Sequence, residues 1–507
     1  MAIAMAALGS VTVTAATPGT AQAACGHVAS DFNGDGIGDV VAREPTADEG
    51  GLSEVGAVRI LYGKSSGVSA AGNQLIDEAA LHGLTPPDLH DKFGESSASG
   101  YFNSDCYADL AIGIPVKGNN QIATGGTVVI IYGSKNGLDL STAKVFTETQ
   151  FLPAGDPELG ASLAAGDFNG DGLSDLAMGA PGADIGGGVA IIYGSSTGLT
   201  LTGHKFFTQD SSGVPGTGEP FDGFGLSLAA ADFNGDGRCD LAVGVPEENI
   251  GDIDQAGDVV LMLGSKSGLT GTGATAWSQN TSGVPGTVED SDEFGTVLAA
   301  GDITGDGKAD LVIGDQSESV GTALLGGSIT VLRGASGGLT ATGAQAWSEA
   351  TAGVPGTEQS NGFFGFALTV ADFNGDGHDD VAIGTGNAVG SVSGAGSVVM
   401  LRGTSTGLTA TGAQYWDQNT SGISGTSETN DLFGEYLQAV NVVSQKYSGL
   451  VIGVPDEDTA TFTDNGAIEV MRGGATGLTA TGSQFFDSQG LVGGAEDNEQ
   501  MGTGPFV

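Results

Sequence analysis

The chain has 507 residues, of which 91 are glycine, and its 61 acidic residues outnumber its 15 lysines and arginines, so the formal net charge is −46. This charge excludes nucleic acid as a natural partner, because phosphate binding needs a basic surface, and it argues against electrostatic adhesion to anionic membranes. Hydrophobic residues make up 39% of the chain, too many for a solvated acidic tail, and the length exceeds what one simple core serves.

The first 23 residues have the features of a signal peptide. They carry no charge, and residues 21–23 (Ala-Gln-Ala) fit the small-x-small pattern of a cleavage site, although no basic residue leads the segment. We therefore expect a secreted protein whose mature chain is residues 24–507. A lipoprotein anchored through Cys25 is the alternative, but the leucine usual in such sites is absent. No other window approaches the roughly 20 apolar residues of a spanning helix, so no membrane insertion is expected.

The rest of the chain is a series of seven repeats. Their most regular feature is the string Asp-Phe-Asn-Gly-Asp-Gly-x-x-Asp, which occurs four times, and a fifth copy has Ile303 and Thr304 in place of Phe and Asn. Two decayed copies complete the series, and the seven strings begin at residues 31, 101, 167, 232, 302, 372 and 441. A fixed period of this length is typical of an array of one supersecondary unit.

Each repeat carries other features in the same phase. Eight residues before every string from the second on lies an apolar-Gly pair, such as Phe224-Gly225, and the apolar run after each string ends in Gly-x-Pro or a relic of it. A β-branched run follows, and then an aromatic segment that includes Trp277, Trp347 and Trp416 in three repeats. The pattern predicts about four short strands in every ~70 residues, with glycine-rich turns between them and no helices.

A four-stranded unit repeated about an axis is the blade of a β-propeller, and a linear solenoid is the competing geometry. The first repeat lacks an apolar-Gly pair before Asp31. At the other end of the chain, Met501-Gly502 is such a pair with no string after it. A ring whose two ends join in one blade requires this arrangement. The predicted fold is therefore all-β: a seven-bladed propeller of four-stranded antiparallel blades. Met501 to Val507 are expected to complete the first blade.

The strings have the composition of a Ca²⁺-binding loop. Positions 1, 3, 5 and 9 offer side-chain oxygens, position 7 offers its carbonyl, and Gly at position 6 permits the turn that folds the chain around an ion. The competing interpretation is an Asx-rich turn held by its own hydrogen bonds. Five copies in register favour the metal, and Mg²⁺ would demand stricter octahedral geometry, so Ca²⁺ is the predicted cofactor.

About five ions are predicted, one for each string that keeps an acid at positions 1, 5 and 9. The predicted ligands are Asp31, Asn33, Asp35 and Asp39; Asp167, Asn169, Asp171, Leu173 and Asp175; Asp232, Asn234, Asp236, Arg238 and Asp240; Asp302, Thr304, Asp306, Lys308 and Asp310; and Asp372, Asn374, Asp376, His378 and Asp380. In the second string Tyr101 and Cys106 replace positions 1 and 6, so a weak or absent ion is expected there. The seventh string has Asn441 and Gly449 at positions 1 and 9, and no ion is expected.

The combination of Phe-Gly, a Ca²⁺-type loop and Gly-Ala-Pro in one repeat resembles the FG-GAP family, the propeller repeats of the integrin α-chain head and of many secreted bacterial proteins. The resemblance covers essentially the whole mature chain. It implies a seven-bladed propeller and a role in binding a protein or glycan ligand, for example in adhesion. FG-GAP repeats also occur in glycosylphosphatidylinositol-specific phospholipase D, so an extracellular hydrolase is the alternative. In that family the chemistry resides in a separate zinc domain, and no such His-rich segment is present in these residues.

Other patterns that suggest an enzyme have simpler explanations. Gly-x-Ser-x-Gly occurs four times, beginning at Gly63, Gly194, Gly334 and Gly403, but always in the same repeated turn and without the helix that a nucleophile elbow needs. The five histidines form no metal-ligand spacing, and no pair of acids is singled out for glycoside chemistry. The recurring tryptophans favour blade packing over sugar stacking. Specificity is expected in the irregular segments Leu84–Lys92 and Glu247–Asp254.

Three cysteines in a secreted chain suggest one disulfide and one free thiol. Cys25 stands just before the first string and Cys106 lies inside the second, in neighbouring blades, so we expect these two to pair and Cys239 to stay free. The side chain of Cys239 should point away from the ion because the next residue, Asp240, is a predicted ligand. We expect a monomer.

Overall fold

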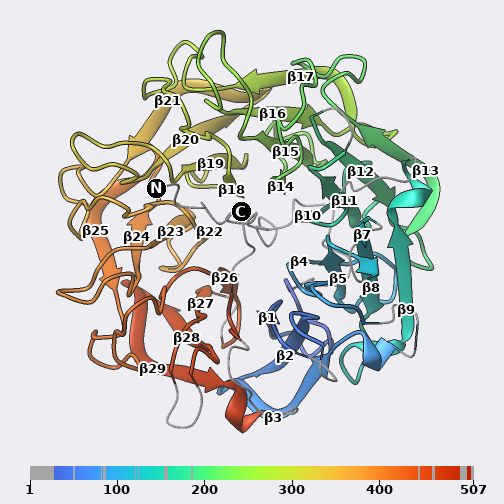
Figure 1. Cartoon of the computed structure of the whole chain (residues 1–507), viewed down its shortest axis with the longest axis horizontal. Coiled ribbons are helices and arrows are strands. Elements are labelled where there is room, and N and C mark those ends of the chain that lie inside the picture. The colour runs from blue at the N-terminus through green and yellow to red at the C-terminus, as the bar shows by residue number, and fades with distance from the viewer. Residues whose placement is uncertain are drawn as a thin grey trace.

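The structure is a computed structural model that describes residues 28–503 except 49–51, 82, 84–86, 120–121, 124, 153–157, 184–185, 444–445, 459–462 and 492–499. The predicted signal peptide (1–23) lies outside the described residues. Within the described residues, seven sheets radiate from a common axis as the blades of a ring (Figure 1). The predicted all-β, seven-bladed propeller is confirmed.

The blades are numbered along the chain, and their strands run in chain order from the axis outward. The strands are β1 (Val40–Glu44), β2 (Ala57–Lys64) and β3 (Gly67–Ile76) in blade 1; β4 (Ser96–Gly100), β5 (Asp109–Ile114), β8 (Thr127–Tyr132) and β9 (Asp139–Thr147) in blade 2; β10 (Leu163–Gly166), β11 (Asp175–Ala180), β12 (Gly188–Tyr193) and β13 (Thr200–Phe207) in blade 3; β14 (Leu228–Ala231), β15 (Asp240–Val245), β16 (Asp258–Leu263) and β17 (Thr270–Trp277) in blade 4; β18 (Val297–Gly301), β19 (Asp310–Asp315), β20 (Ser328–Ala335) and β21 (Gly338–Trp347) in blade 5; β22 (Leu368–Ala371), β23 (Asp380–Thr385), β24 (Ser397–Arg402) and β25 (Thr409–Trp416) in blade 6; and β26 (Leu437–Val440), β27 (Gly449–Val454), β28 (Ala467–Gly474) and β29 (Gly477–Asp487) in blade 7.

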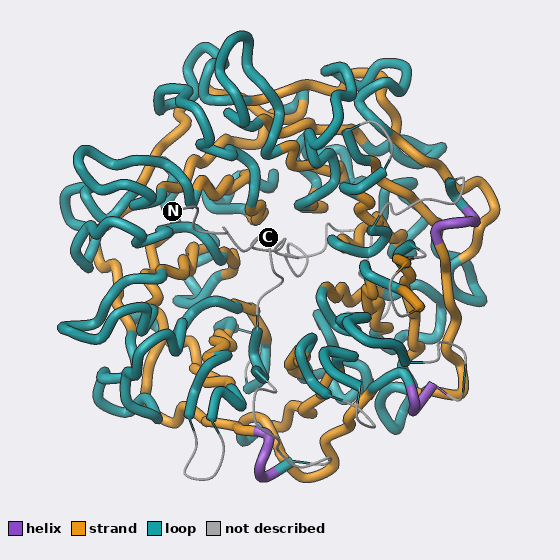
Figure 2. The backbone as a smooth tube through the Cα atoms, in the orientation of Figure 1, coloured by secondary structure: helices purple, strands orange, loops and turns teal. Residues whose placement is uncertain are grey.

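The remaining elements are small. A two-stranded hairpin, β6 (Gly118–Asn119) with β7 (Ile122–Ala123), projects from blade 2, and three 3₁₀ turns follow the outermost strands of blades 1, 2 and 7: η2 (Ala79–Leu81), η3 (Glu148–Gln150) and η4 (Ser488–Gly490) (Figure 2). No helix among the described residues has the length and apolar character needed to cross a membrane.

The inner strands are short and rich in small residues because seven of them must fit around the axis. In blade 3, β10 has the sequence Leu-Ala-Ala-Gly and pairs antiparallel with β11. A Cβ atom added to Gly166 would lie only 2.9 Å from Cβ of Cys239 in blade 4. Inner strands of neighbouring blades therefore approach too closely for larger side chains at this position.

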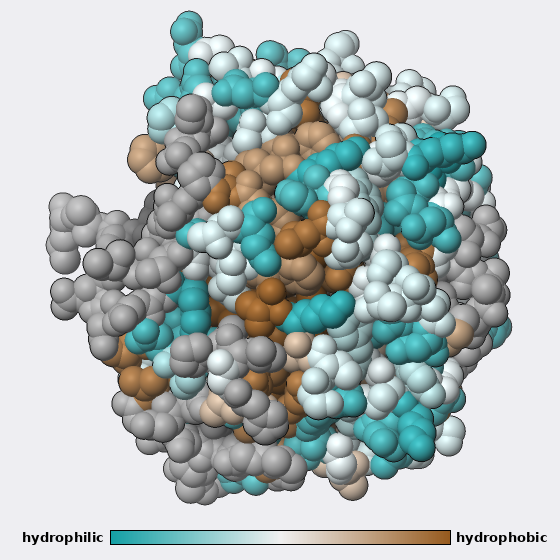
Figure 3. Space-filling view, turned by 90° about the vertical axis from the view of Figure 1, so that its right-hand side faces the viewer, coloured by the Kyte–Doolittle hydropathy of each residue, from teal (hydrophilic) through white to brown (hydrophobic). Residues whose placement is uncertain are grey.

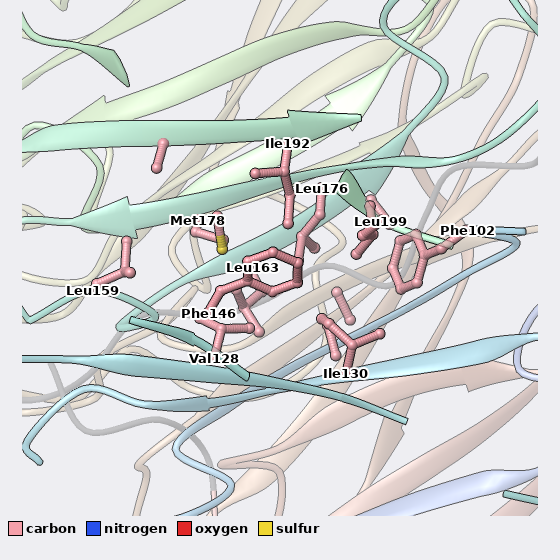
Figure 4. Close-up of a cluster of buried hydrophobic side chains, with 14 of the residues drawn as sticks. Phe102, Val128, Ile130, Phe146, Leu159, Leu163, Leu176, Met178, Ile192 and Leu199 are labelled. Carbon is pink, nitrogen blue, oxygen red and sulfur yellow. The ribbon is translucent and has the colours of Figure 1, made fainter. Parts of the chain in front are cut away.

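The core consists of seven apolar clusters, one between each pair of neighbouring blades in the described residues. Figure 4 shows the cluster between blades 2 and 3, where Val128 and Ile130 of β8 face Leu163, Leu176 and Ile192 of blade 3. Position 2 of each string also contributes a buried side chain, such as Phe168, which is fully buried. Complete burial of side chains of this size stabilises the fold by about 1.5–3 kcal/mol each, so each string is anchored in the core.

The outermost strands are half-exposed and irregular. In each blade the pairing of the two outermost strands shifts register near the middle, as between Ile191 and Tyr193 in blade 3. Such bulges spoil the free edge as a template for pairing with another chain. Figure 3 shows the rim around β9 and β13, where polar and apolar side chains are intermixed.

The two ends of the chain close the ring in the predicted way. The N–H of Gly502 donates to the carbonyl of Arg43 in β1 (3.0 Å), just as the N–H of Gly160 donates to Gly179 (2.8 Å) in blade 3. Met501 is fully buried in the cluster between blades 7 and 1. Met501 and Gly502 therefore serve as the apolar-Gly pair of blade 1, as predicted, whereas residues 504–507 lie outside the described residues.

The up-and-down course of the strands places different turns on the two faces of the ring. In blades 2 to 7 the strings join the first strand to the second, and in blade 1 the string leads directly into β1, so the strings share one face with the turns between the two outermost strands. We call this the string face. The apolar-Gly pairs and the segments after Gly-x-Pro lie on the other, which we call the Phe-Gly face. The predicted specificity segment Glu247–Asp254 lies on the Phe-Gly face, and part of the other, residues 84–86, lies outside the described residues.

Candidate metal centres

Position 1 of each of the five predicted Ca²⁺ strings organises the turn. In the string of blade 3, one carboxylate oxygen of Asp167 accepts hydrogen bonds from the N–H groups of Gly170 (2.7 Å) and Asp171 (3.1 Å), and the other accepts from Gly172 (2.8 Å). Position 5 makes one such bond, from the N–H of Leu173 to Asp171 (3.0 Å). Position 1 makes the same kind of bonds in Asp31, Asp232, Asp302 and Asp372.

In the five predicted Ca²⁺ strings, position 9 is the first residue of the second strand (blades 3 to 6) or directly precedes β1 (blade 1), and its carboxylate is almost entirely buried. Asp175 accepts the N–H of Phe168 at 3.0 Å and that of Gly194, at the end of β12, at 2.9 Å. Burial raises the pKa of Asp175 to about 8, and the nearby carboxylates of Asp167 and Asp171 add to the effect. For the same reasons the pKa of the other position-9 side chains is raised, to about 8 in Asp39, about 7 in Asp240 and Asp380, and about 6 in Asp310.

Position 3 contains an unused ligand atom in blade 4, whereas in blade 1 Oδ1 of Asn33 accepts the N–H of Asp35 (2.9 Å). In blade 4 the amide nitrogen of Asn234 donates to both oxygens of Asp240, at 3.1 and 3.0 Å. Its Oδ1 is buried and has no hydrogen-bond partner among the described residues. Asn33 and Asn169 likewise donate to position 9, and the amide of Asn374 does so at 3.1 Å. The donor set of a string therefore fits a hard cation, since a cation would use this oxygen and offset the clustered negative charge.

Position 7 was expected to matter only through its carbonyl, but its side chain also packs against the preceding blade. A Cβ atom on Gly170 would lie 2.9 Å from Cγ of Arg238, and one on Gly235 would lie 3.1 Å from Cγ of Lys308. Both basic groups turn back to position 5 of their own strings: Arg238 lies 2.6 Å from Asp236, and Lys308 lies 3.0 Å from Asp306. These ion pairs were not predicted. They partly neutralise a predicted ligand in two of the five strings.

Backbone hydrogen bonds join all seven strings into a ring. The carbonyl of position 1 in each blade accepts the N–H of position 8 in the next, for example Cys239 to Asp167 (2.9 Å) and Ala309 to Asp232 (3.0 Å). The last link runs from Gly38 in blade 1 to Asn441 in blade 7, at 3.0 Å. A change in one string is therefore felt directly by its neighbours.

The two decayed strings lose ligand donors; the string of blade 2 keeps its turn, and residues 444–445 of the string of blade 7 lie outside the described residues. In blade 2, Asp109 is still buried and accepts the N–H of Phe102 (2.9 Å), whereas the Tyr101 side chain donates its hydroxyl to the carbonyl of Val28 (2.7 Å). Cys106 has a φ of 69° at the position that glycine occupies elsewhere. In blade 7, Asn441 accepts from Ser448 at 3.4 Å.

The cysteine prediction is confirmed as far as the described residues reach. Cys106 is disulfide-bonded, and Cys239 is a free thiol. Cys25, the predicted partner of Cys106, lies outside the described residues. The Cys239 side chain packs in the apolar cluster between blades 3 and 4, away from the string, and burial raises its pKa to about 12.

One acidic group was missed by sequence reasoning. In the described residues, carboxylate oxygens of three acidic side chains gather within 4.8 Å of one another at Asp292, Asp315 and Glu318, and the strings are more open than this. The group lies on the Phe-Gly face, between blades 4 and 5. An acid recurs eight residues after position 9 of the string in several repeats, as Glu248, Glu318 and Glu457, and the second repeat has a lysine at that position. This recurrence is the sequence signal that could have found the group.

Known proteins share the repeats found here. Phosphatidylinositol-glycan-specific phospholipase D of Homo sapiens is 33% identical over 221 residues, which cover 43% of this chain and 25% of that protein. Integrin alpha-5 of Xenopus laevis is 32% identical over 232 residues (44% and 20%), and integrin alpha-PS5 of Drosophila melanogaster is 36% identical over 161 residues (31% and 15%). The chain spans a quarter or less of the length of these relatives.

Among solved structures, a putative 6-phosphogluconolactonase from Bacteroides uniformis has a TM-score of 0.40 at 10% sequence identity. The comparison covers 91% of this chain and 97% of that one. This likeness is too distant to bear on function. The FG-GAP repeat family matches residues 159–193, 224–262, 294–332 and 364–399. Each matched range contains one string and the apolar-Gly pair before it. With the same features in phase in the other blades, the chain is an FG-GAP repeat protein folded as a seven-bladed propeller.

Proposed function

We propose that this chain is a secreted, Ca²⁺-stabilised propeller that binds a protein or glycan ligand, for example in adhesion, through its Phe-Gly face. One observation carries the proposal. In the described residues, the two large apolar side chains that stand exposed are Phe221, at 82%, and Leu324, at 67%. Both lie in turns of the Phe-Gly face, in blades 4 and 5, on a rigid ring. Exposed aromatic and aliphatic side chains on a rigid scaffold are typical anchors of a binding site.

Calcium is proposed for the five strings that keep their acids. In each string, positions 1, 3, 5 and 9 would hold the ion with side-chain oxygens and position 7 with its carbonyl. Bound Ca²⁺ would offset the negative charge of three acids per string. The buried Oδ1 of Asn234 and the raised pKa of the position-9 carboxyls support this assignment.

Secretion is supported by two features. The uncharged first 23 residues fit a signal peptide, and Cys106 is disulfide-bonded. Disulfides persist in oxidising compartments and are rare in the cytosol.

The binding proposal is tested with the mature chain in millimolar Ca²⁺, against a glycan array and against proteins captured from its own culture. A ligand of the Phe-Gly face should be lost, by at least tenfold in affinity, in the double variant Phe221→Ser with Leu324→Ser. The control is Lys135→Ala, an exposed side chain of the string face, which should bind as the unchanged protein does. Equal binding by the double variant would contradict the proposed face.

A hydrolase is the second candidate, because five of the similar proteins are named as phosphatidylinositol-glycan-specific phospholipase D. Incubation with phosphodiester, ester and glycan substrates distinguishes the two candidates. We expect no turnover above that of the heat-denatured protein. Clear turnover that survives purification to homogeneity would overturn the binding proposal.

A further inference from the structure

The junction of blades 1 and 2 contains a partly buried cation, Lys117, whose side chain is 16% exposed. On the Phe-Gly face, Nζ of Lys117 lies 2.7 Å from a carboxylate oxygen of Glu78 and 2.5 Å from one of Asp91. Both carboxylates are fully buried. Glu78 lies two residues after the outermost strand of blade 1, Asp91 lies two residues before Phe93, and Lys117 lies eight residues after position 9 of its string. The ammonium group compensates charges that would otherwise be costly to bury.

The junction of blades 4 and 5 has the same three positions with different chemistry. Gln279 lies two residues after β17, Asp292 lies two residues before Phe294, and Glu318 lies eight residues after Asp310. An acid thus stands where the first junction has its lysine. A third acid, Asp315, joins them from the end of β19, where blade 2 has an isoleucine.

These side chains form a tight group of oxygens. Oxygen atoms of Asp292, Asp315 and Glu318 all lie within 4.8 Å of one another. The amide nitrogen of Gln279 donates to Asp315 at 3.1 Å and to Glu318 at 2.8 Å. Asp315 is completely buried, Asp292 is 2% exposed and Gln279 is 7% exposed. Glu318 is half-buried, so the group lies between the blades with Glu318 at its solvent side.

Two atoms of the group lack partners. Oδ1 of Asp315 and Oε1 of Gln279 are buried without a hydrogen bond among the described residues. An unpartnered buried polar atom is costly, and here two of them belong to side chains that meet at one point. Rotation of the Gln279 amide would present its oxygen in place of its nitrogen, since the two ends of an amide have the same shape.

The charge of the group is also uncompensated. Among the described residues, no lysine, arginine or histidine forms an ion pair with Asp292, Asp315 or Glu318. The neighbouring junctions also contain buried acids, but they have Val245 and Thr385 at the position of Asp315. Between blades 5 and 6, the amide of Asn387 donates to Glu349 at 2.6 Å.

We propose that Asp292, Asp315 and Glu318, with the amide oxygen of Gln279, form a binding site for one Ca²⁺ ion between blades 4 and 5 on the Phe-Gly face. The donors are all oxygens, as a hard divalent cation prefers, and they number enough for Ca²⁺ with water completing its shell. The ion would take the part that the Lys117 ammonium plays at the first junction. This site is distinct from the strings, because Asp310 and Asp315 stand at opposite ends of β19, about 17 Å apart at 3.3 Å per residue.

Anomalous diffraction tests the site directly. Crystals of the full chain are grown with Tb³⁺, a probe for Ca²⁺ sites that scatters anomalously, and data are collected at the terbium edge. We expect a peak among Asp292, Asp315 and Glu318. Its absence from crystals that show peaks in the strings would overturn the proposal in favour of carboxyls that share protons. A peak here with none in the strings would sustain this site and refute the calcium part of the proposed function.

A variant that copies the chemistry of the first junction gives a second test. Glu318→Lys should place an ammonium group where Lys117 has one, so the chain should bind one Ca²⁺ fewer in equilibrium dialysis while keeping its fold. The matched control is Glu248→Lys between blades 3 and 4, which should leave the number of ions unchanged. If Glu318→Lys does not fold, Asp315→Asn replaces it as the test, because an asparagine side chain has nearly the same shape as an aspartate side chain. An ion count equal to that of the unchanged protein in a folded Glu318→Lys or Asp315→Asn variant would refute the site.

Discussion

The position-9 aspartates hold the fold together whether or not a metal is bound. Asp175 is completely buried and ties its own string to the end of β12 through the N–H of Gly194, at 2.9 Å. Its removal would leave buried N–H groups without acceptors, at about 1–3 kcal/mol each. A variant at this position would therefore confuse loss of a ligand with loss of structure. Position 5 is the better probe, because Asp171 is exposed and accepts one backbone hydrogen bond.

We predict that Asp171→Ala removes one bound Ca²⁺ per chain and about one fifth of the thermal stabilisation that Ca²⁺ provides. The measurement is elemental analysis of protein dialysed in millimolar Ca²⁺, with melting curves alongside. Asp105→Ala is the matched control: Asp105 holds position 5 of the decayed second string and accepts the N–H of Tyr107 at 3.0 Å in the same way. An equal ion count for the Asp171 variant and the unchanged protein would show that this string is a plain turn.

At the scale of the element, β28 contains an acidic exception to the buried, mostly apolar run that forms the corresponding strands of the other blades. Glu469 is 1% exposed and lies at a position that is Val260 in β16 and Val399 in β24. Burial raises the pKa of Glu469 to about 7. A carboxyl group whose pKa is raised by folding binds its proton more tightly in the folded state than in the unfolded state. The free energy of unfolding therefore falls as the pH rises from about 4.5 through about 7.

We predict that Glu469→Val stabilises the protein, and more so at high pH. The raised pKa corresponds to at most about 3 kcal/mol of stability lost between pH 5 and pH 9, and the valine variant avoids that loss. Urea denaturation at pH 5.5 and pH 8.5 checks this, with Glu469→Gln as a variant that removes only the charge. A stability difference that is the same at both pH values would contradict the predicted titration.

The sequence predicts elements well where one repeat contains all the information. The strings, the apolar-Gly pairs and the order of the strands follow from residues that lie within about 70 positions of one another, and glycine at position 6 of a string has a direct geometric reason. What could not be predicted lies between repeats. The pairing of Arg238 with Asp236, the packing of position 7 on the preceding blade and the meeting of Gln279 with Asp315 depend on how neighbouring blades are set against each other.

At the scale of the whole molecule, the ring depends on a junction made by residues far apart in the chain. Tyr436 of blade 7 lies against blade 1, with its ring 4.6 Å from the guanidinium carbon of Arg43. Gln484 in β29 donates to the carbonyl of Val68 and accepts its N–H, both at 2.8 Å. Met501 and Gly502 complete the contact from the inner side. Without this junction, the ring would expose the facing surfaces of two blades.

We predict that deletion of residues 500–507 lowers the melting temperature of the whole ring in one cooperative step. The deletion removes the fully buried Met501 and the Gly502 hydrogen bond, and it leaves the edge of blade 1 open to water. Met501→Leu, which keeps the volume and apolar character, should cost less than about 1.5 kcal/mol. Calorimetry of both proteins provides the measurement. If the shortened chain melts at the temperature of the unchanged protein, the closure does not hold the ring together.

The last prediction concerns removal of metal from the whole ring. Extracellular Ca²⁺ modules bind with Kd values of roughly 10⁻⁴ to 10⁻³ M, and at free Ca²⁺ tenfold above Kd each site stabilises the folded state by RT ln 11, about 1.4 kcal/mol. Five equal strings give about 7 kcal/mol, comparable to the stability of a whole domain.

The sign follows from repulsion, because each string holds three carboxylates close together when no cation is bound. We therefore expect chelation to lower the melting temperature by roughly 7–10 °C. The seven strings are linked by hydrogen bonds from position 8 to position 1, so the loss should appear as a shift of one transition rather than as separate melting of single blades. Melting with and without chelator, repeated after Ca²⁺ is restored, measures the effect. A curve indifferent to chelator would leave the strings as turns held by their own hydrogen bonds.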